Sequence, residues 1–330
     1  MKTDSLISRY SFIVSMFLVF VFTYARDNLG IKVPIDLFTL ILGPAFLFYK
    51  KRDFIAFCAI EPLIFNGIRT VYVFAIAIII YLLKFGLKSN RFFFMICMVL
   101  FLELSHILID PFDWGHYFGY FVTYMFLGIL IHDAINLSYD DSIFVMKAYV
   151  ISFMVIMVDL MQIFVSYHGN IISMLLGGNR FGDIDNIHWY IDLDYYISIN
   201  ANTIAMLSLF AISISLVCYN LRCESNKIFW LCSLYISMFF GLATGSRTFF
   251  MALGIIFLIW LFFIKHTGNK SNTQNVIAFI VIACILYIGI NYADLMIDNI
   301  FNRFKSGEST TGHRDEIFEV YTNYMFDNAK

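Results

Sequence analysis

One arginine stands alone inside a long apolar stretch in the second half of the chain. In the segment GLATGSRTFF, Gly241 to Phe250, Arg247 is the only charged residue between Ile228 and Ile264. That stretch is long enough to cross a bilayer twice, because one crossing takes about 20 apolar residues. An ionised side chain at such a place is costly unless it is used, so Arg247 is a functional candidate. The alternative is a hairpin turn at Thr244-Gly245-Ser246, with an arginine that anchors it at the membrane interface.

A second basic group lies in the tail of the chain. Apolar residues after Gly312 recur at helical spacing and predict an amphipathic helix. His313 and Arg314 then stand at its N-terminus, where free backbone N–H groups favour an anion. Arg303 would add to the same positive surface. The alternative is an interfacial helix of mixed charge.

The polar segment between residues 167 and 199 combines acids, amides and aromatic residues. It contains Arg180, Asp183 and Trp189. Sugar hydroxyls need bidentate polar partners, and the apolar face of a pyranose stacks on aromatic rings, so this segment is a candidate sugar-binding loop. The alternative is an aromatic belt at the membrane interface, which uses the same residue types.

Two pairs of polar residues lie within apolar runs. Glu103 precedes His106 by three positions, and Asp159 precedes Gln162 by three, so each pair shares a helix face. Such residues could build a proton or ion path. We favour hydrogen bonds between helices, because no neighbouring segment offers an evident series of partners.

The composition identifies the class of protein that must position these residues. Of 330 residues, 60% are hydrophobic and 14% charged, against about 25% charged in soluble domains. The chain is therefore expected to be a polytopic membrane protein. With a net charge of -2 and no basic face, it is not expected to bind nucleic acid.

The apolar runs predict an all-α fold of about eleven transmembrane helices. The expected segments are 10–25, 34–49, 53–66, 68–87, 92–109, 117–132, 142–166, 200–221, 228–246, 248–264 and 276–293. The third is the weakest, because Glu61-Pro62 interrupts it, and a re-entrant segment is its alternative.

Loops rich in Lys and Arg predict the orientation of these helices. The basic residues of 50–52, 84–91, 222–227 and 265–270 fall on one side if the third segment crosses, and that side is then cytoplasmic. The expected organisation is N-terminal transmembrane helices over 1–166, an extracytoplasmic loop over 167–199, C-terminal transmembrane helices over 200–293, and an extracytoplasmic segment over 294–330. Arg247 then faces the outer side.

Four landmarks in this order resemble the O-antigen ligase and O-antigen polymerase family of bacterial inner-membrane glycosyltransferases. They are Arg180-Phe181-Gly182, the helix start Asn200-Ala201-Asn202, Thr244-Gly245-Ser246-Arg247 and Gly312-His313-Arg314. The resemblance covers about Asn179 to Lys330. Members of the family usually continue into one or more further spans, so the sequence is expected to lack the family's last span or spans.

The resemblance implies roles for the arginines. Arg247 and Arg314 match the arginines that face the lipid pyrophosphate in the family, and Arg180 matches the arginine of the earlier outer loop. The ligases carry a histidine past the outer helix, where members of the family continue into further spans. No metal-binding cluster is visible in the sequence, so the arginines would replace a metal, and no cofactor is expected. The catalytic base stays open among His313, Asp315, Glu316 and the carboxylates of 183–194.

The implied activity is transfer of a glycan from undecaprenyl pyrophosphate, with the active site facing outward from the inner membrane. We favour a polymerase of O-antigen or surface-polysaccharide repeat units, whose acceptor is another lipid-linked unit. The alternatives are an O-antigen ligase, whose acceptor is lipid A-core, and a transporter or flippase of the lipid-linked unit. Expected partners are the lipid-linked glycan, membrane lipid and a chain-length regulator protein.

Overall fold

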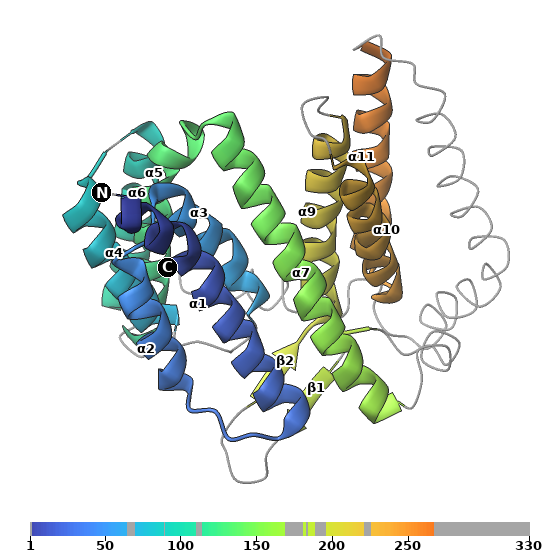
Figure 1. Ribbon diagram of the computed structural model, residues 1–330, viewed down its shortest axis with the longest axis horizontal. Helices are drawn as coiled ribbons and strands as arrows, with labels where there is room; N and C mark the ends of the chain where they lie inside the picture. Colours follow the sequence, from blue (N-terminus) through green and yellow to red (C-terminus); the bar gives the residue numbers. More distant parts are fainter. Residues whose placement is uncertain are drawn as a thin grey trace, which may run out of the picture. The chain divides into compact units, whose positions relative to one another are not determined.

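The computed structural model describes residues 2–64, 70–88, 90–109, 114–168, 181–182, 184–188, 196–220 and 226–266 (Figure 1). The chain divides into two compact units, Met1–Phe257 and Leu258–Lys330. The first unit contains almost all of the described residues. In the second unit only residues 258–266 are described, and they continue the last helix.

The described part of the chain is helical, apart from one short pair of strands. The first helices are α1 (Lys2–Leu29), α2 (Ile35–Phe46), α3 (Lys51–Ile60), the 3-10 turn η1 (Glu61–Leu63), α4 (Thr70–Phe85), α5 (Arg91–Ile109), α6 (Trp114–Ile135) and α7 (Tyr139–His168). After the strands follow α9 (Ala201–Asn220), α10 (Lys227–Ala243) and α11 (Arg247–His266). Each segment expected up to 248–264 thus contains a helix, whereas 276–293 lies outside the described residues.

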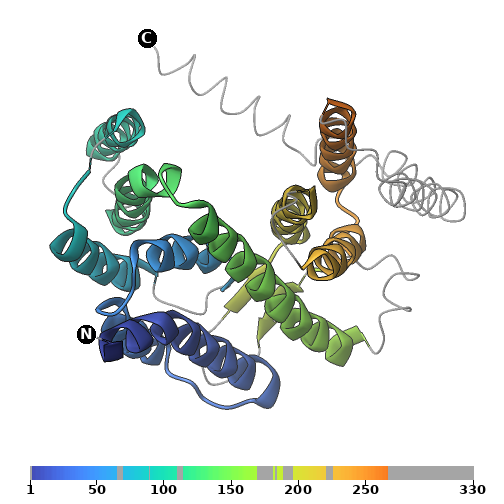
Figure 2. The same cartoon turned by 45° about the horizontal axis from the view of Figure 1, so that its top comes forward.

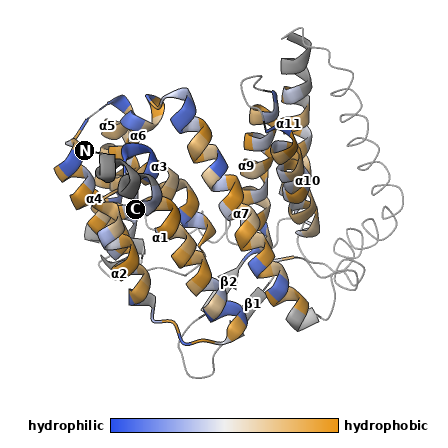
Figure 3. Cartoon of the chain, in the orientation of Figure 1, coloured by the Kyte–Doolittle hydropathy of each residue, from blue (hydrophilic) through white to orange (hydrophobic). Residues whose placement is uncertain are grey.

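Four of the described helices are long and apolar enough to cross a membrane. They contain the stretches Tyr10–Leu29, Tyr117–Ile135, Tyr139–Val165 and Ala201–Asn220. Shorter apolar helices are Asp36–Phe46, Val71–Phe85, Lys227–Ala243 and Thr248–Phe257. Figure 3 shows hydrophobic residues along these helices and hydrophilic residues near many of their ends. This supports a membrane protein, while the number of about eleven spans stays a prediction.

Helix α3 is short and lies in the core of the first unit. It packs against α4, α6 and α7, and its Phe54 and Phe57 are fully buried. Ten residues rise only about 15 Å, half of a bilayer core. The helix gives way to η1 at Glu61, next to Pro62, as the sequence predicted. These ten residues alone are therefore too short to cross the bilayer core.

Helix α7 lies between two groups of helices in the first unit (Figures 1 and 2). It packs against α1 and α3 on one side and against α9 and α10 on the other. Helices α9 and α10 form the closest pair, and the hydroxyls of Ser215 and Ser233 are 2.6 Å apart between them. Small polar residues of this kind let two helices approach closely in a membrane.

The corners between helices bring several basic loops to one end of the first unit. The Lys84 ammonium at the end of α4 donates to the carbonyl oxygens of Leu47 and Tyr49, at 2.8 and 2.6 Å. Arg52 at the start of α3 lies 2.8 Å from Asp141 at the start of α7. The loops at 47–52, 84–88 and 133–141 therefore share one end, as the expected topology requires.

A short antiparallel hairpin precedes α9 and is an addition to the expected helical fold. Strand β1 (Ile184–His188) pairs with β2 (Tyr196–Ile199), with Ile184 opposite Ile199 and His188 opposite Tyr196. A register shift lies between Ile184 and Ile187. Because β1 starts just after Gly182 and β2 ends just before Asn200, the hairpin has both its ends beside the start of α9.

Candidate functional site

The candidate site is built on the tight turn that joins α10 to α11. The Thr244 hydroxyl donates to the Gly241 carbonyl oxygen at 2.6 Å and accepts the Ser246 backbone N–H at 3.3 Å. Gly245 adopts a φ of 58°, in the left-handed region that glycine enters without strain. Thr244 and Ser246 are buried. The turn predicted from Thr244-Gly245-Ser246 is therefore confirmed.

Arg247 is the first residue of α11. The Phe250 N–H donates to the Ser246 carbonyl oxygen, which marks Ser246 as the residue that opens the helix. The first N–H groups of a helix have no intrahelical acceptor and favour a negative charge nearby. The backbone around Arg247 thus suits an anion. The Arg247 side chain lies outside what the structure describes.

The start of α9 is hydrogen-bonded to this turn. The Ser246 hydroxyl donates to Asn202 Oδ1 at 3.0 Å, and the two residues are 44 positions apart in sequence. Asn200 opens α9, because its side-chain oxygen accepts the Asn202 N–H at 2.8 Å. The hydrogen bond between Ser246 and Asn202 therefore joins the first turn of α9 to the start of α11.

The Phe181–Gly182 pair lies against the end of α10 and the start of α9. The Phe181 N–H donates to the carbonyl oxygen of Ala243 at 2.9 Å, and its buried ring lies 5.3 Å from that of Phe240. Gly182 has a φ of 97°, and a Cβ there would lie 2.5 Å from Ile204 Cδ1. The left-handed φ favours glycine here, and a Cβ would also crowd the Ile204 side chain and the backbone of Ala201.

The structure thus brings together parts of three sequence landmarks. Phe181–Gly182, the start of α9 and the Thr244–Ser246 turn form one cluster joined by hydrogen bonds and packing, which we call the anchor wall. The other predicted site residues lie outside the described residues; they are Arg180, Asp183, Trp189, Arg303, His313 and Arg314. In sequence, Arg180 and Asp183 flank the anchored Phe181–Gly182 pair.

The polar residues within α7 are bonded to α1. Asp159 accepts a hydrogen bond from the Asn28 amide, and Gln162 Oε1 accepts one from the Tyr24 hydroxyl at 2.7 Å. The favoured interpretation, hydrogen bonds between helices, therefore holds for Asp159 and Gln162. Their partners stand four residues apart on α1, a spacing that places both on one helix face. The His106 side chain lies outside the described residues.

A double-mutant cycle measures this link. We expect Asn28→Leu and Asp159→Leu each to destabilise the protein, because each removes the partner of the other side chain, and Asp159 is buried. Their coupling energy should be about 0.6 kcal/mol and at most about 1.7, the range found for such bonds in membranes. The measurement is thermal unfolding of the purified protein in detergent. Asp159→Asn, which keeps an acceptor oxygen but cannot ionise, should retain full cellular activity; loss of activity at parental stability would indicate a proton or ion path instead.

Comparison of the chain with protein-family models, with curated proteins and with solved structures finds no match. The functional interpretation therefore stands on the residues, the geometry of the anchor wall and the resemblance of the sequence landmarks.

Proposed function

We propose that this chain is a glycosyltransferase of the bacterial inner membrane that polymerises repeat units of O-antigen or a related surface polysaccharide. The donor is a glycan on undecaprenyl pyrophosphate, and the acceptor is a second lipid-linked unit. The observation that supports this most is the anchor wall. Because Arg180 precedes Phe181 and Arg247 follows Ser246, two segments that carry a functional arginine start from the same buried contacts.

The chemistry requires a group that stabilises a leaving pyrophosphate. The acceptor hydroxyl oxygen attacks C1 of the donor sugar, and the bond between C1 and the phosphate oxygen breaks. Undecaprenyl pyrophosphate leaves with the electron pair, and the hydroxyl proton passes to a base. In this proposal Arg247 and Arg314 hold the pyrophosphate through bidentate hydrogen bonds. A guanidinium group stays protonated at physiological pH, so both side chains keep their positive charge. Donors already aimed at the developing charge are usually the largest catalytic contribution.

The remaining predicted residues fit the two substrates. Arg180 and Arg303 extend the positive surface for the donor, while Asp183 and Trp189 suit sugar hydroxyls and the apolar face of a ring. His313 is a base within the same tail segment as Arg314, with Asp315 and Glu316 as alternatives. General base catalysis contributes typically about 10²–10⁴-fold.

A reconstituted assay tests the proposed reaction. The full chain is placed in vesicles with a labelled repeat unit on undecaprenyl pyrophosphate, and glycan length and released lipid pyrophosphate are measured. We expect a ladder of longer glycans, with one pyrophosphate released for each new bond. Movement of the labelled unit across the bilayer without new glycosidic bonds would identify a transporter, and transfer only to added lipid A-core would identify a ligase.

The proposed site also requires a definite topology. A reporter fused at Asn226, in the corner before α10, should be cytoplasmic, because that corner contains Lys227 and follows Arg222. A reporter fused at Ser309 should be extracytoplasmic. If both reporters are on the same side of the membrane, Arg247 and Arg314 do not share a surface and the proposed site is wrong.

A further inference from the structure

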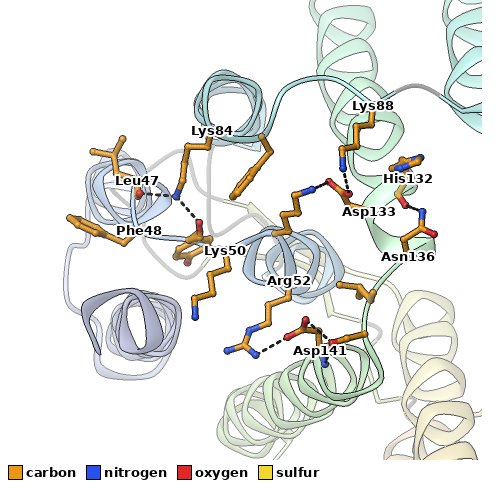
Figure 4. Close-up of a pocket in the computed structure, with 15 residues that line it drawn as sticks. Leu47, Phe48, Lys50, Arg52, Lys84, Lys88, His132, Asp133, Asn136 and Asp141 are labelled. Carbon is orange, nitrogen blue, oxygen red and sulfur yellow. Dashed lines mark hydrogen bonds and ion pairs between the residues drawn. The ribbon is translucent and has the colours of Figure 1, made fainter. Parts of the chain in front are cut away.

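A cleft opens at the basic end of the first unit, and the proposed reaction does not use it. It has a volume of about 910 Å³ and lies among the α2–α3 corner, the end of α4 and the α6–α7 corner (Figure 4). We call it the cationic cleft, because five basic residues line it: Lys50, Lys51, Arg52, Lys84 and Lys88. Only two carboxylates, Asp133 and Asp141, line it as well. The cleft therefore has an excess of positive charge.

Three of the five basic side chains are engaged in holding the helix corners. Lys84 donates to two carbonyl oxygens at the end of α2, where a cation is favourable. Lys51 forms an ion pair of 2.8 Å with Asp133. Arg52 pairs with Asp141 and lies over the ring of Phe144, with its guanidinium carbon 4.4 Å from the ring centroid. These contacts give the cleft a fixed shape.

The other two lysines have charge to offer to a ligand. Lys88 is half exposed, and its ammonium is 3.8 Å from Asp133, which already accepts the closer ion pair from Lys51. Lys50 is exposed, and no ion pair within 4 Å is found for it among the described residues. In Figure 4 Lys88 extends towards Asp133, whereas Lys50 lies across α3 from it and extends away from it. The two lysines therefore add positive charge at separate places in the cleft.

The rim of the cleft is apolar. Leu47 and Phe48 line it and are 58% and 47% exposed. Exposed apolar side chains of this size beside a charged cleft suit a ligand that has both an anionic head and hydrocarbon chains.

We infer that the cationic cleft binds the phosphate headgroup of an anionic phospholipid from the leaflet at this end of the bundle. Lys50 and Lys88 attract the phosphate, and the acyl chains lie along Leu47 and Phe48. Basic pockets between transmembrane helices bind anionic lipid headgroups in this way. The apolar rim favours a lipid over free phosphate, because free phosphate gains nothing from Leu47 or Phe48. This inference does not depend on the proposed transferase activity.

The test is a binding titration on the full chain in neutral detergent with a fluorescent phosphatidylglycerol as the probe. We expect unlabelled phosphatidylglycerol to displace the probe, and both phosphatidylcholine and a large excess of inorganic phosphate to leave it bound. Lys50→Gln with Lys88→Gln should weaken binding about 30-fold, since a basic side chain near an anionic membrane surface contributes about 1 kcal/mol. Lys50→Arg with Lys88→Arg should bind as the parent does.

The matched control is Lys227→Gln, an exposed lysine at the start of α10 that does not line the cleft. It removes a surface charge and should leave the affinity unchanged, and all variants should unfold at the parental temperature. Parental binding by the Lys50→Gln, Lys88→Gln protein would overturn the inference. Equal displacement by inorganic phosphate would overturn the lipid as the ligand and identify a site for free phosphate.

Discussion

Arg247→Ala should reduce polymer formation by at least about 10²–10³-fold while the protein still inserts at normal abundance. This is the expected cost of removing one donor aimed at the charge that develops on the leaving group. Arg247→Lys keeps the charge but loses the planar fork of donors, so it should also fall well short of the parent. If Arg247 only anchors the hairpin at the membrane interface, lysine should replace it without loss, because both side chains extend a charge to the interface in the same way.

The measurement is the ladder of polymer lengths made by cells that lack the parent gene and carry each variant at matched expression. Thr248→Ala is the matched control, since it changes the next residue of α11, which is exposed, and leaves the arginine in place. Parental ladders from both Arg247→Ala and Arg247→Lys would remove the catalytic role and leave the anchoring one.

The helices of the first unit could be predicted from hydropathy, because a membrane helix needs a long apolar run and polar residues end it. The ends of α7, at Tyr139 and His168, lie close to the predicted 142–166. Helix α3 shows the limit of this signal. The break at Glu61-Pro62 was visible, but burial of Phe54 and Phe57 among α4, α6 and α7 depends on neighbours that no local pattern identifies.

Contacts between distant segments could not be predicted in the same way. Asp159 was a visible polar residue, whereas its partner Asn28 is 131 positions away and lies at the end of an ordinary apolar helix. The anchor wall is similar: Thr244-Gly245-Ser246 predicted the turn, but nothing local indicated that Ser246 bonds to Asn202. The β1–β2 hairpin was not expected either, because it lies within a polar segment whose residue types also suit a loop.

The two exposed lysines of the cationic cleft illustrate a different limit. The basic residues at 50–52 and 84–88 were read from the sequence only as markers of orientation. The structure gives them separate roles, since the Lys84 ammonium bonds to carbonyl oxygens at the end of α2, whereas Lys50 and Lys88 line an open cleft. Such a division depends on which carbonyl oxygens and carboxylates lie nearby, and composition does not carry that information.

The close approach of Gly241 in α10 to Phe249 in α11, beside the Arg247 turn, gives a second large expected effect. A Cβ on Gly241 would lie 2.1 Å from Cε2 of Phe249, whose ring is fully buried and has little room to move. We therefore expect Gly241→Ala to destabilise the protein by about 1–3 kcal/mol, the usual cost of overpacking a filled core. Gly241 also accepts the Thr244 hydroxyl, so a shift there displaces the turn that opens α11. A displacement of about 1 Å at a reacting group can cost about 10²-fold in rate, so the polymer ladder should shorten as well.

Gly254→Ala is the control, because a Cβ on Gly254 meets nothing within 4 Å and the residue lies on the same helix as Phe249. This change should leave the ladder intact and raise the unfolding temperature slightly, since alanine is favoured over glycine within a helix by about 1 kcal/mol. Gly241→Ala combined with Phe249→Ala should remove the clash and recover stability relative to the sum of the two single changes. Thermal unfolding in detergent and the polymer ladder are measured on the same preparations. Gly241→Ala could instead match the parent in both unfolding temperature and polymer ladder. The contact between Gly241 and Phe249 would then not position Arg247, and the turn would be held mainly by the hydrogen bonds of Thr244 and by the bond from Ser246 to Asn202.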